Sequence, residues 1–279
     1  MKKISRRSFL AAAGLSVAAL ALTACGGSSA STASSVASSA ASSEAASTSA
    51  AAGELTTVEA GKLTMATNAA FPPYEMTTDA GKFEGIDIET AQAIADKLGL
   101  ELQIDDMDFD AALLSVQQGK ADIVMAGVTV TDERKAVMDF SDSYATGIQS
   151  IIVPEGSDIA SPDDLAGKKI GTQRGTTGYI YCSDDFGDEN VVAYDDGLTA
   201  VQALNNGQVD AVVIDNAPAQ EFIAANPGLK ILDTSYAEED YAIGMAKGSS
   251  LEDAVNAALK ELKADGTLQS IVDKYITAE

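Results

Sequence analysis

Short apolar runs alternate with amphipathic segments along most of this chain, from about residue 54 to the C-terminus. The run KLTMAT (62–67) is typical of a strand. In DIETAQAIADKLG (87–99), five apolar residues recur at helical spacing and a glycine ends the pattern. These five are Ile88, Ala91, Ile94, Ala95 and Leu98. The pattern therefore predicts a strand followed by an amphipathic helix, which is the repeating unit of an α/β fold.

The same alternation continues to residue 275. Further strands are expected at LELQID (100–105), ADIVMAG (121–127), KKIGTQ (168–173), NVVAY (190–194), DAVVID (210–215) and YAIGMAK (241–247). Further helices are expected at 110–120, 161–168, 175–182, 197–208, 217–226, 250–266 and 267–275. Two near-copies of a small α/β unit predict two lobes, with mostly parallel strand pairing.

The first 24 residues read as a targeting signal. Lys2, Lys3, Arg6 and Arg7 precede an apolar stretch, FLAAAGLSVAALALTA, that is short for a membrane span. We therefore predict a signal peptide over residues 1–24. SRRSFL (5–10) is also similar to a twin-arginine export signal, so the choice between the Sec and Tat routes stays open.

The apolar stretch ends in LTAC (22–25), which resembles the lipobox of bacterial lipoproteins. This resemblance implies that Cys25 is lipidated, with palmitate, and anchors the protein to the outer face of the cell membrane. The alternative is an ordinary signal peptide that is cleaved near Ala24. Residues 25–53 are almost entirely Ser, Ala and Thr and predict a flexible tether, because they bury too little apolar surface to fold.

The charge balance excludes some function classes. The chain has 18 Lys and Arg against 42 Asp and Glu, a net charge of -24, so a phosphate-binding surface for nucleic acid is not expected. It has no histidine, so a nucleophilic thiol at Cys182 would lack its usual base. We expect Cys182 to be a small core side chain, without a disulfide if Cys25 is lipidated. No cofactor is expected, and no EF-hand-like spacing of acids predicts a metal site.

Polar residues at strand ends are the candidates for chemistry, because ligands of open α/β sheets bind at the carboxyl ends of strands. Arg134 follows the strand end MAGVT (125–129) by a few residues. Its guanidinium forms a planar fork that matches a carboxylate. The alternative is an ordinary surface ion pair with one of the neighbouring acids Asp132, Glu133 or Asp139.

Asp215 ends an apolar strand, where it either caps the next helix or meets a cation. Arg134 and Asp215 together would hold the two charged ends of a zwitterion. Singly, the aromatics Phe71 and Phe109 are more typical of a core, and Thr176 and Thr177 of a helix start.

Several stretches, in this order and spacing, resemble the polar amino-acid-binding proteins, the solute-binding subunits of ABC importers in bacterial extracellular solute-binding protein family 3. They are ATNAAFPPYEM, GKFEGIDIETAQAIADKLG, MDFDAALLSVQQGKADIVMAGVTVTDERKAVMDFS, IGTQRGTTG and VDAVVIDN. The resemblance covers residues 60–278 and implies a type II periplasmic-binding-protein-like α/β fold. In that fold two α/β lobes are joined by two crossover strands, with a ligand cleft between them. We expect lobe 1 at 54–146, lobe 2 at 147–239 and a return to lobe 1 at 240–279.

The resemblance also implies roles for eleven residues. Arg134 would bind the α-carboxylate of an L-amino acid, helped by Thr129 and the amides of Thr176 and Thr177. Asp215 would take the α-ammonium, with the Gly127 carbonyl and the Thr129 hydroxyl. The remaining contacts would be Phe71 and Phe109 as walls for the side chain, Ala126 through its backbone, and Asn68 and Gln173 as determinants of specificity.

Binders of cationic amino acids and of glutamine commonly carry an acid where this chain has Asn68, so a neutral polar ligand is favoured. The alternative is an acidic side chain, which Arg174 next to the site could serve. The implied partners are an ABC permease and its ATPase, and the protein is expected to be a monomer and not an enzyme. The alternatives are an amino-acid-related dehydratase or a ligand sensor on the same scaffold. A dehydratase would need an acid or base in the cleft, which a chain without histidine would have to supply from another residue.

Overall fold

The computed structural model of the chain describes residues 55–276. All described residues belong to one compact unit of the chain. The predicted signal peptide, Cys25 and the tether lie outside the described residues. Within residues 55–276, no helix combines the length and the apolarity that a bilayer span requires.

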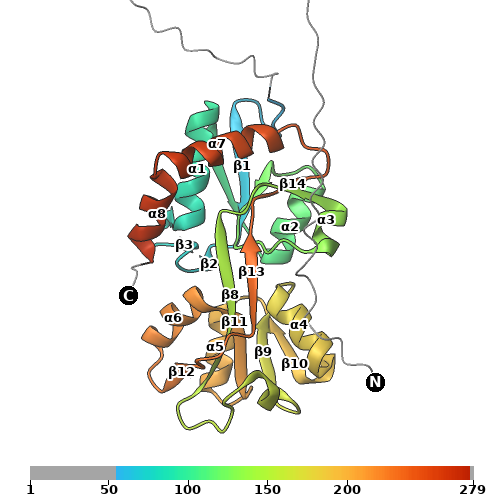
Figure 1. Cartoon of the computed structure of the whole chain (residues 1–279), viewed down its shortest axis with the longest axis vertical. Helices are drawn as coiled ribbons and strands as arrows, with labels where there is room; N and C mark the ends of the chain where they lie inside the picture. The colour runs from blue at the N-terminus through green and yellow to red at the C-terminus, as the bar shows by residue number, and fades with distance from the viewer. Residues whose placement is uncertain (1–54, 277–279) are drawn as a thin grey trace, which may run out of the picture. The chain divides into compact units, whose positions relative to one another are not determined.

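The first sheet has the order β5-β1-β6-β14-β7. Its strands are β1 (Lys62–Thr67), β5 (Glu101–Asp106), β6 (Ile123–Val124), β7 (Met138–Phe140) and β14 (Gly244–Ala246). Strand β1 pairs in parallel with β5 and β6, whereas β14 is antiparallel to β6 and β7. Its helices are α1 (Ile86–Leu98), α2 (Phe109–Gln117), α7 (Glu252–Ala264) and α8 (Thr267–Tyr275) (Figure 1).

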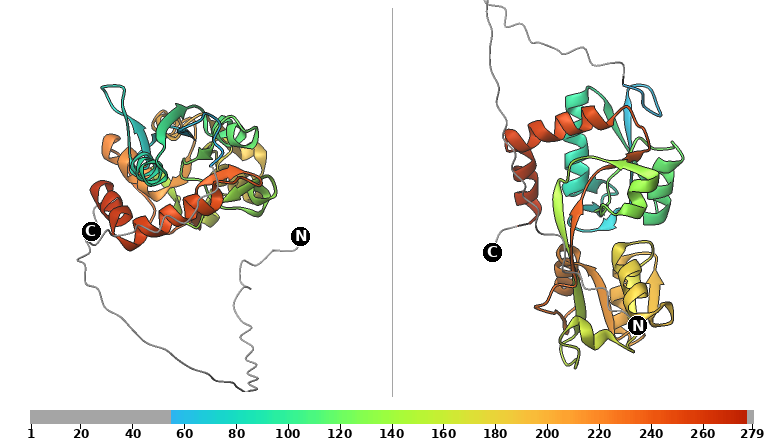
Figure 2. Two further views of the ribbon diagram at one scale, coloured as in Figure 1. Left: turned by 90° about the horizontal axis from the view of Figure 1, so that it is seen from above. Right: turned by 45° about the vertical axis from the view of Figure 1, so that its right-hand side comes forward.

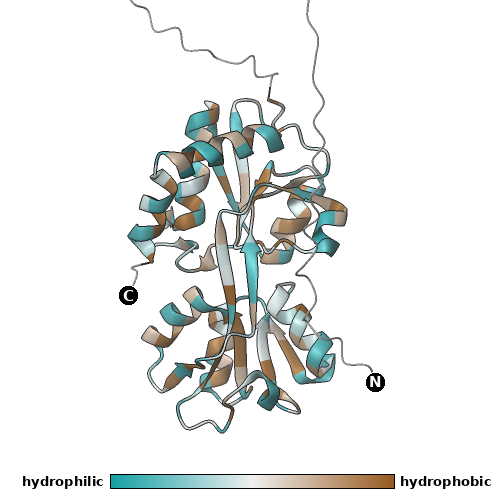
Figure 3. Cartoon of the chain, viewed as in Figure 1, coloured by the Kyte–Doolittle hydropathy of each residue, from teal (hydrophilic) through white to brown (hydrophobic). Residues whose placement is uncertain are grey.

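The second sheet has the order β10-β9-β11-β8-β12, with β13 paired to β8. Its strands are β8 (Ala145–Pro154), β9 (Ile170–Gln173), β10 (Val191–Tyr194), β11 (Ala211–Asp215), β12 (Leu229–Ile231) and β13 (Ala237–Tyr241). Helices α4 (Thr177–Phe186), α5 (Gly197–Asn205) and α6 (Asn216–Ala225) pack against these strands. In Figure 3 most strands of both sheets are pale or brown, whereas β13 is polar, and polar residues colour the outer faces of the helices.

The smaller elements lie close to the first sheet or in the loops of the second. They are β2 (Ala70–Phe71), β3 (Glu75–Thr77), β4 (Phe83–Glu84), α3 (Asp132–Val137), and the 3-10 turns η1 (Pro162–Leu165) and η2 (Asp188–Asn190). Cys182 is fully buried in the core of the second sheet, as predicted, and burial raises the pKa of its thiol to about 12. Burial and the raised pKa both disfavour the reactive thiolate form at this position.

Strands β8 and β13 run side by side between the two sheets (Figures 1 and 2). They pair antiparallel, with Thr146 opposite Asp240 and Ile148 opposite Glu238. At Gly147 an added Cβ would lie 2.4 Å from the Tyr241 ring, so the glycine leaves room for that ring between the strands. The expected lobe boundaries, 146/147 and 239/240, fall within these strands; as domain boundaries they stay a prediction.

Most predicted elements are present, and four expectations need correction. Pairing is not mostly parallel, because β8 and β14 run opposite to the other strands of their sheets, so every strand pair that includes one of them is antiparallel. The helix expected at 161–168 is the single turn η1, since Gly167 has φ 76 and ends it. Only Ile123–Val124 of the strand expected at 121–127 is extended and paired as β6. The strand expected at 241–247 is the shorter β14, because Tyr241 still belongs to β13 in the second sheet.

Candidate functional site

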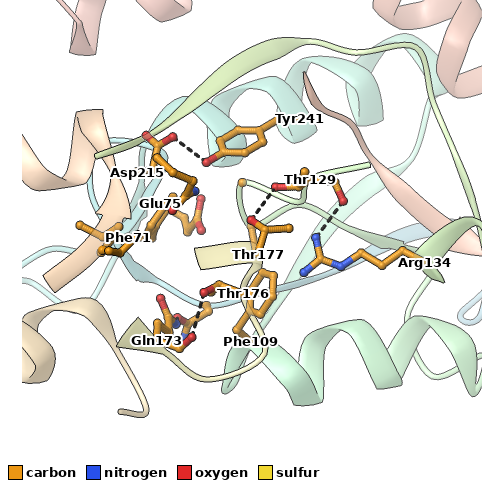
Figure 4. A pocket seen from close by; sticks show the side chains of 16 residues that line it. Phe71, Glu75, Phe109, Thr129, Arg134, Gln173, Thr176, Thr177, Asp215 and Tyr241 are labelled. Carbon is orange, nitrogen blue, oxygen red and sulfur yellow. Dashed lines mark hydrogen bonds between the residues drawn. The ribbon is translucent and has the colours of Figure 1, made fainter. Parts of the chain in front are cut away.

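A pocket of about 440 Å³, partly open to solvent, lies between the two sheets (Figure 4). All eleven residues that the sequence predicted for a ligand site line this pocket. They are Asn68, Phe71, Phe109, Ala126, Gly127, Thr129, Arg134, Gln173, Thr176, Thr177 and Asp215. The structure therefore brings the whole predicted set together, while the role of each residue as a ligand contact stays a prediction.

The lining comes from strand ends and helix starts of both sheets. Phe109 is the first residue of α2, and Arg134 lies in α3 behind the N-cap Thr131. Thr176 caps α4, its hydroxyl accepting from the Tyr179 amide, and Asp215 ends β11. Because parallel strands place their carboxyl ends at one edge, side chains far apart in sequence meet at this edge.

Arg134 is a buried cation. Only 9% of the residue is exposed, and its guanidinium donates to the carbonyls of Thr129 (2.8 Å) and Gly175 (3.1 Å). It lies 5.4 Å from the centre of the Phe109 ring. No carboxylate among residues 55–276 forms an ion pair with it, and burial lowers its pKa. The alternative of a surface ion pair is wrong, because Asp139 pairs with Lys247 instead.

Asp215 is a buried carboxylate, 2% exposed, with three donors. One oxygen accepts from the Ala217 amide at 3.1 Å, which is the helix cap that the sequence allowed. The other accepts from the Ile148 amide and from the Tyr241 hydroxyl, both at 2.8 Å. Burial raises the pKa of Asp215 to about 6 even so. Arg134 and Asp215 thus provide one buried charge of each sign, from two different sheets, in one pocket.

Two predicted specificity residues meet across the pocket. The amide of Gln173, on β9, donates to the Asn68 side-chain oxygen at 2.8 Å. Asn68 in turn donates to the Met107 carbonyl at 3.0 Å. This contact joins the first sheet to the second and places two neutral amides at one wall of the pocket.

Glu75 was not among the predicted site residues, yet it lines the pocket and is completely buried. Neither of its carboxyl oxygens has a hydrogen-bond donor among the described residues. The adjacent Asp87 accepts from the Gly127 amide (3.0 Å) and the Tyr144 hydroxyl (2.8 Å) through one oxygen. Burial raises the pKa of Glu75 well above its usual range and that of Asp87 to about 6, and the charge of the nearby Asp87 adds to the rise at Glu75.

Other lining or supporting residues were missed as well. Gln149, Val213, Ile214 and Tyr241 line the pocket, and Glu239 lies behind its wall. A signal existed for Glu75, which is the one acid in the apolar stretch AAFPPYEM (69–76). Nothing in the local sequence distinguishes Glu239 from Glu238 or Asp240, because only the strand pairing turns its side chain inward.

Comparisons with known proteins agree with this architecture. Residues 63–278 match the family of bacterial extracellular solute-binding proteins, family 3. The L-cystine-binding protein TcyJ of Escherichia coli (strain K12) is 33% identical over 226 residues, 79% of this chain and 85% of TcyJ. The arginine-binding extracellular protein ArtP of Bacillus subtilis (strain 168) is 33% identical over 228 residues, 78% of this chain and 87% of ArtP.

A solved structure of an ancestral arginine-binding protein bound to arginine is 43% identical. The alignment covers 77% of this chain and 98% of that one, with a TM-score of 0.74. The expected fold, two α/β lobes of the type II periplasmic-binding-protein class, is confirmed.

The burial of Glu75 predicts how stability changes with pH. The pKa of Glu75 is higher in the folded protein than in the unfolded chain. Its contribution to the free energy of unfolding is therefore complete at a pH below the unfolded pKa, and it is lost as the pH rises through the folded pKa. Glu75→Gln removes this titration. The melting temperature of ligand-free Glu75→Gln, relative to the wild type, should therefore rise from about pH 5 to about pH 8.

Scanning calorimetry at both pH values measures this difference. Glu84→Gln on β4 is the matched control, because Glu84 is exposed and should show a small difference independent of pH. A Glu75→Gln difference that is constant or shrinks with rising pH would contradict the assignment of a buried titrating carboxyl.

Proposed function

This chain belongs to the bacterial extracellular solute-binding proteins of family 3, and we propose that its solute is a free L-amino acid held by both charged ends. The observation that carries the proposal is the pair Arg134 and Asp215, two buried opposite charges in one pocket. A buried cation without a counter-ion is costly, and a ligand carboxylate supplies that counter-ion. The α-ammonium of the ligand supplies the counter-ion for Asp215.

Closure of the two lobes follows from where the contacts lie. Arg134 belongs to α3, on the side of the first sheet, and Asp215 ends β11 of the second. A ligand that touches both gains its full set of contacts only when the lobes are together, so binding shifts the equilibrium toward the closed form. That form delivers the amino acid to the permease and ATPase of an ABC importer.

The charges of the pocket favour a cationic side chain. Besides Arg134 and Asp215, its lining contains one further acid, Glu75, which can ionise beside a bound cation. The carboxylate and ammonium of an amino acid pair with the first two and leave Glu75 without a partner. A guanidinium would take that place, with its planar face beside the rings of Phe71 and Phe109. Asn68 alone favours a neutral polar ligand; the buried Glu75 moves our proposal to L-arginine, and the arginine-binding relatives support it.

The enzyme alternative has no support in the comparisons, because the family consists of solute-binding proteins. Asp215 is also held by fixed donors, since it accepts three hydrogen bonds from the protein. These contacts position charges for binding, which suits a receptor.

Arg134→Ala tests the amino-acid proposal. Loss of the guanidinium removes the bidentate partner of the ligand carboxylate, so calorimetric binding should weaken by more than about 100-fold, or about 2.7 kcal/mol. Lys135→Ala is the matched control: it removes an exposed cation from the same helix and should leave affinity unchanged. Retained binding within about tenfold, in a variant with a normal melting curve, would refute the carboxylate assignment.

The ligand class is tested by comparing L-arginine with L-citrulline, its neutral isostere. The wild type should bind arginine at least about tenfold more tightly, because only arginine can pair with Glu75. Glu75→Gln should remove most of this preference, whereas Glu84→Gln should keep it. Equal binding of arginine and citrulline by the wild type would exclude the cationic class and leave the amino-acid function standing.

We also propose that the exported chain is anchored to the outer face of the cell membrane through a lipid on Cys25. The LTAC motif and the Ser/Ala-rich stretch that follows support this. The lobe boundaries 54–146, 147–239 and 240–279 and a monomeric state belong to the same proposal. Cys25→Ala should release the protein from the membrane fraction of its host cells; a variant that still sediments with membranes would argue against the anchor.

A further inference from the structure

Glu239 lies on β13, one of the two strands that connect the sheets, and is 7% exposed. One of its carboxyl oxygens accepts from the hydroxyl of Thr129 (3.0 Å), the hydroxyl of Thr177 (2.9 Å) and the amide of Gln149 (3.1 Å). These three donors line the pocket, whereas Glu239 does not. The carboxylate therefore lies behind the wall and holds residues from both sheets.

The number of hydroxyl protons decides whether Thr129 and Thr177 can donate hydrogen bonds into the pocket or only accept them. Each hydroxyl has one proton and two lone pairs. In one arrangement both hydroxyls donate directly to Glu239. In the other, one hydroxyl donates to Glu239 and the second donates to the first through the 3.3 Å contact between Thr129 and Thr177. Either arrangement uses up both protons within the cluster. The sides of Thr129 and Thr177 that face the pocket therefore present lone pairs.

These lone pairs lie where the proposed ligand needs acceptors. In Figure 4, Thr129 and Thr177 lie between Arg134 and the pair Asp215–Tyr241. An α-ammonium has three N–H donors and no acceptor, and Asp215 already accepts three hydrogen bonds from the protein. Asp215 supplies the opposite charge, but further acceptors are required to satisfy all three donors.

Resting on the proposed function, we propose that Glu239 is a positioning residue that turns the hydroxyls of Thr129 and Thr177 into acceptors for the α-ammonium of the ligand. It acts through these two residues and does not touch the ligand. Because Thr129 follows β6 of the first sheet and Thr177 begins α4 of the second, the acceptor pair is complete only when both meet Glu239. Recognition of the ammonium is thereby tied to closure.

Glu239→Gln tests this role, since an amide can donate to the hydroxyls and let their protons turn toward the pocket. The probes are L-arginine and its deaminated analogue, 5-guanidinopentanoate, titrated by calorimetry. The affinity for arginine should fall about tenfold or more, and that for the analogue less than about twofold. Glu238→Gln, an exposed neighbour on the same strand, should change neither.

A double-mutant cycle separates action through the hydroxyls from a direct effect of charge on Arg134. In a Thr129→Val, Thr177→Val background, Glu239→Gln should have an effect of less than about twofold on arginine binding. Two results would overturn the inference while the amino-acid function stands. In the first, Glu239→Gln weakens binding of arginine and of the analogue equally; in the second, it weakens arginine binding equally in both backgrounds. A wild type that binds no amino acid would overturn the proposed function itself.

Discussion

The burial of Arg134 without an ion-pair partner is the constraint on which the rest of the site depends. Its guanidinium meets two backbone carbonyls, from Thr129 and Gly175, and an aromatic ring, but no carboxylate among residues 55–276 is close enough to form an ion pair. Neutral acceptors offset only part of the desolvation of a cation, so the site is energetically incomplete without an anion. Asp215 presents the opposite case across the same pocket, a buried carboxylate whose pKa is raised to about 6. An amino-acid zwitterion supplies a counter-ion to each of these two buried groups.

The strands that connect the two sheets also build the site. Ile148 on β8 and Tyr241 on β13 donate to Asp215, and Glu239 on β13 gathers donors from both sides. A change in the paths of these strands therefore changes the position of the charged groups. The reverse also holds, because a ligand that draws Arg134 and Asp215 together acts on the same strands. Binding and lobe movement are thus coupled through a few shared hydrogen bonds, without a separate signalling element.

Much of the fold could be predicted from the sequence because local rules decide it, as apolar periodicity does for α1 and β1. The eleven residues of the pocket lining are implied by the resemblance to the solute-binding family, since local patterns alone favour ordinary core, cap and surface positions for several of them. The missed features depend on tertiary pairing. Glu239 faces inward only because β13 pairs with β8, and Glu75 becomes a buried acid with Asp87 of α1 beside it only in the folded chain. Antiparallel pairing of β8 and β14 is likewise decided by the chain crossing between sheets, which no local pattern encodes.

The most direct test of the account is a crystal structure of the protein with a bound L-amino acid. The account predicts that the ligand carboxylate lies within about 2.7–3.2 Å of the Arg134 guanidinium nitrogens, and that the ammonium lies at a similar distance from Asp215. One ligand would then join residues of both sheets. A ligand whose charged ends both contact a single sheet, or whose carboxylate points away from Arg134, would contradict the central claim.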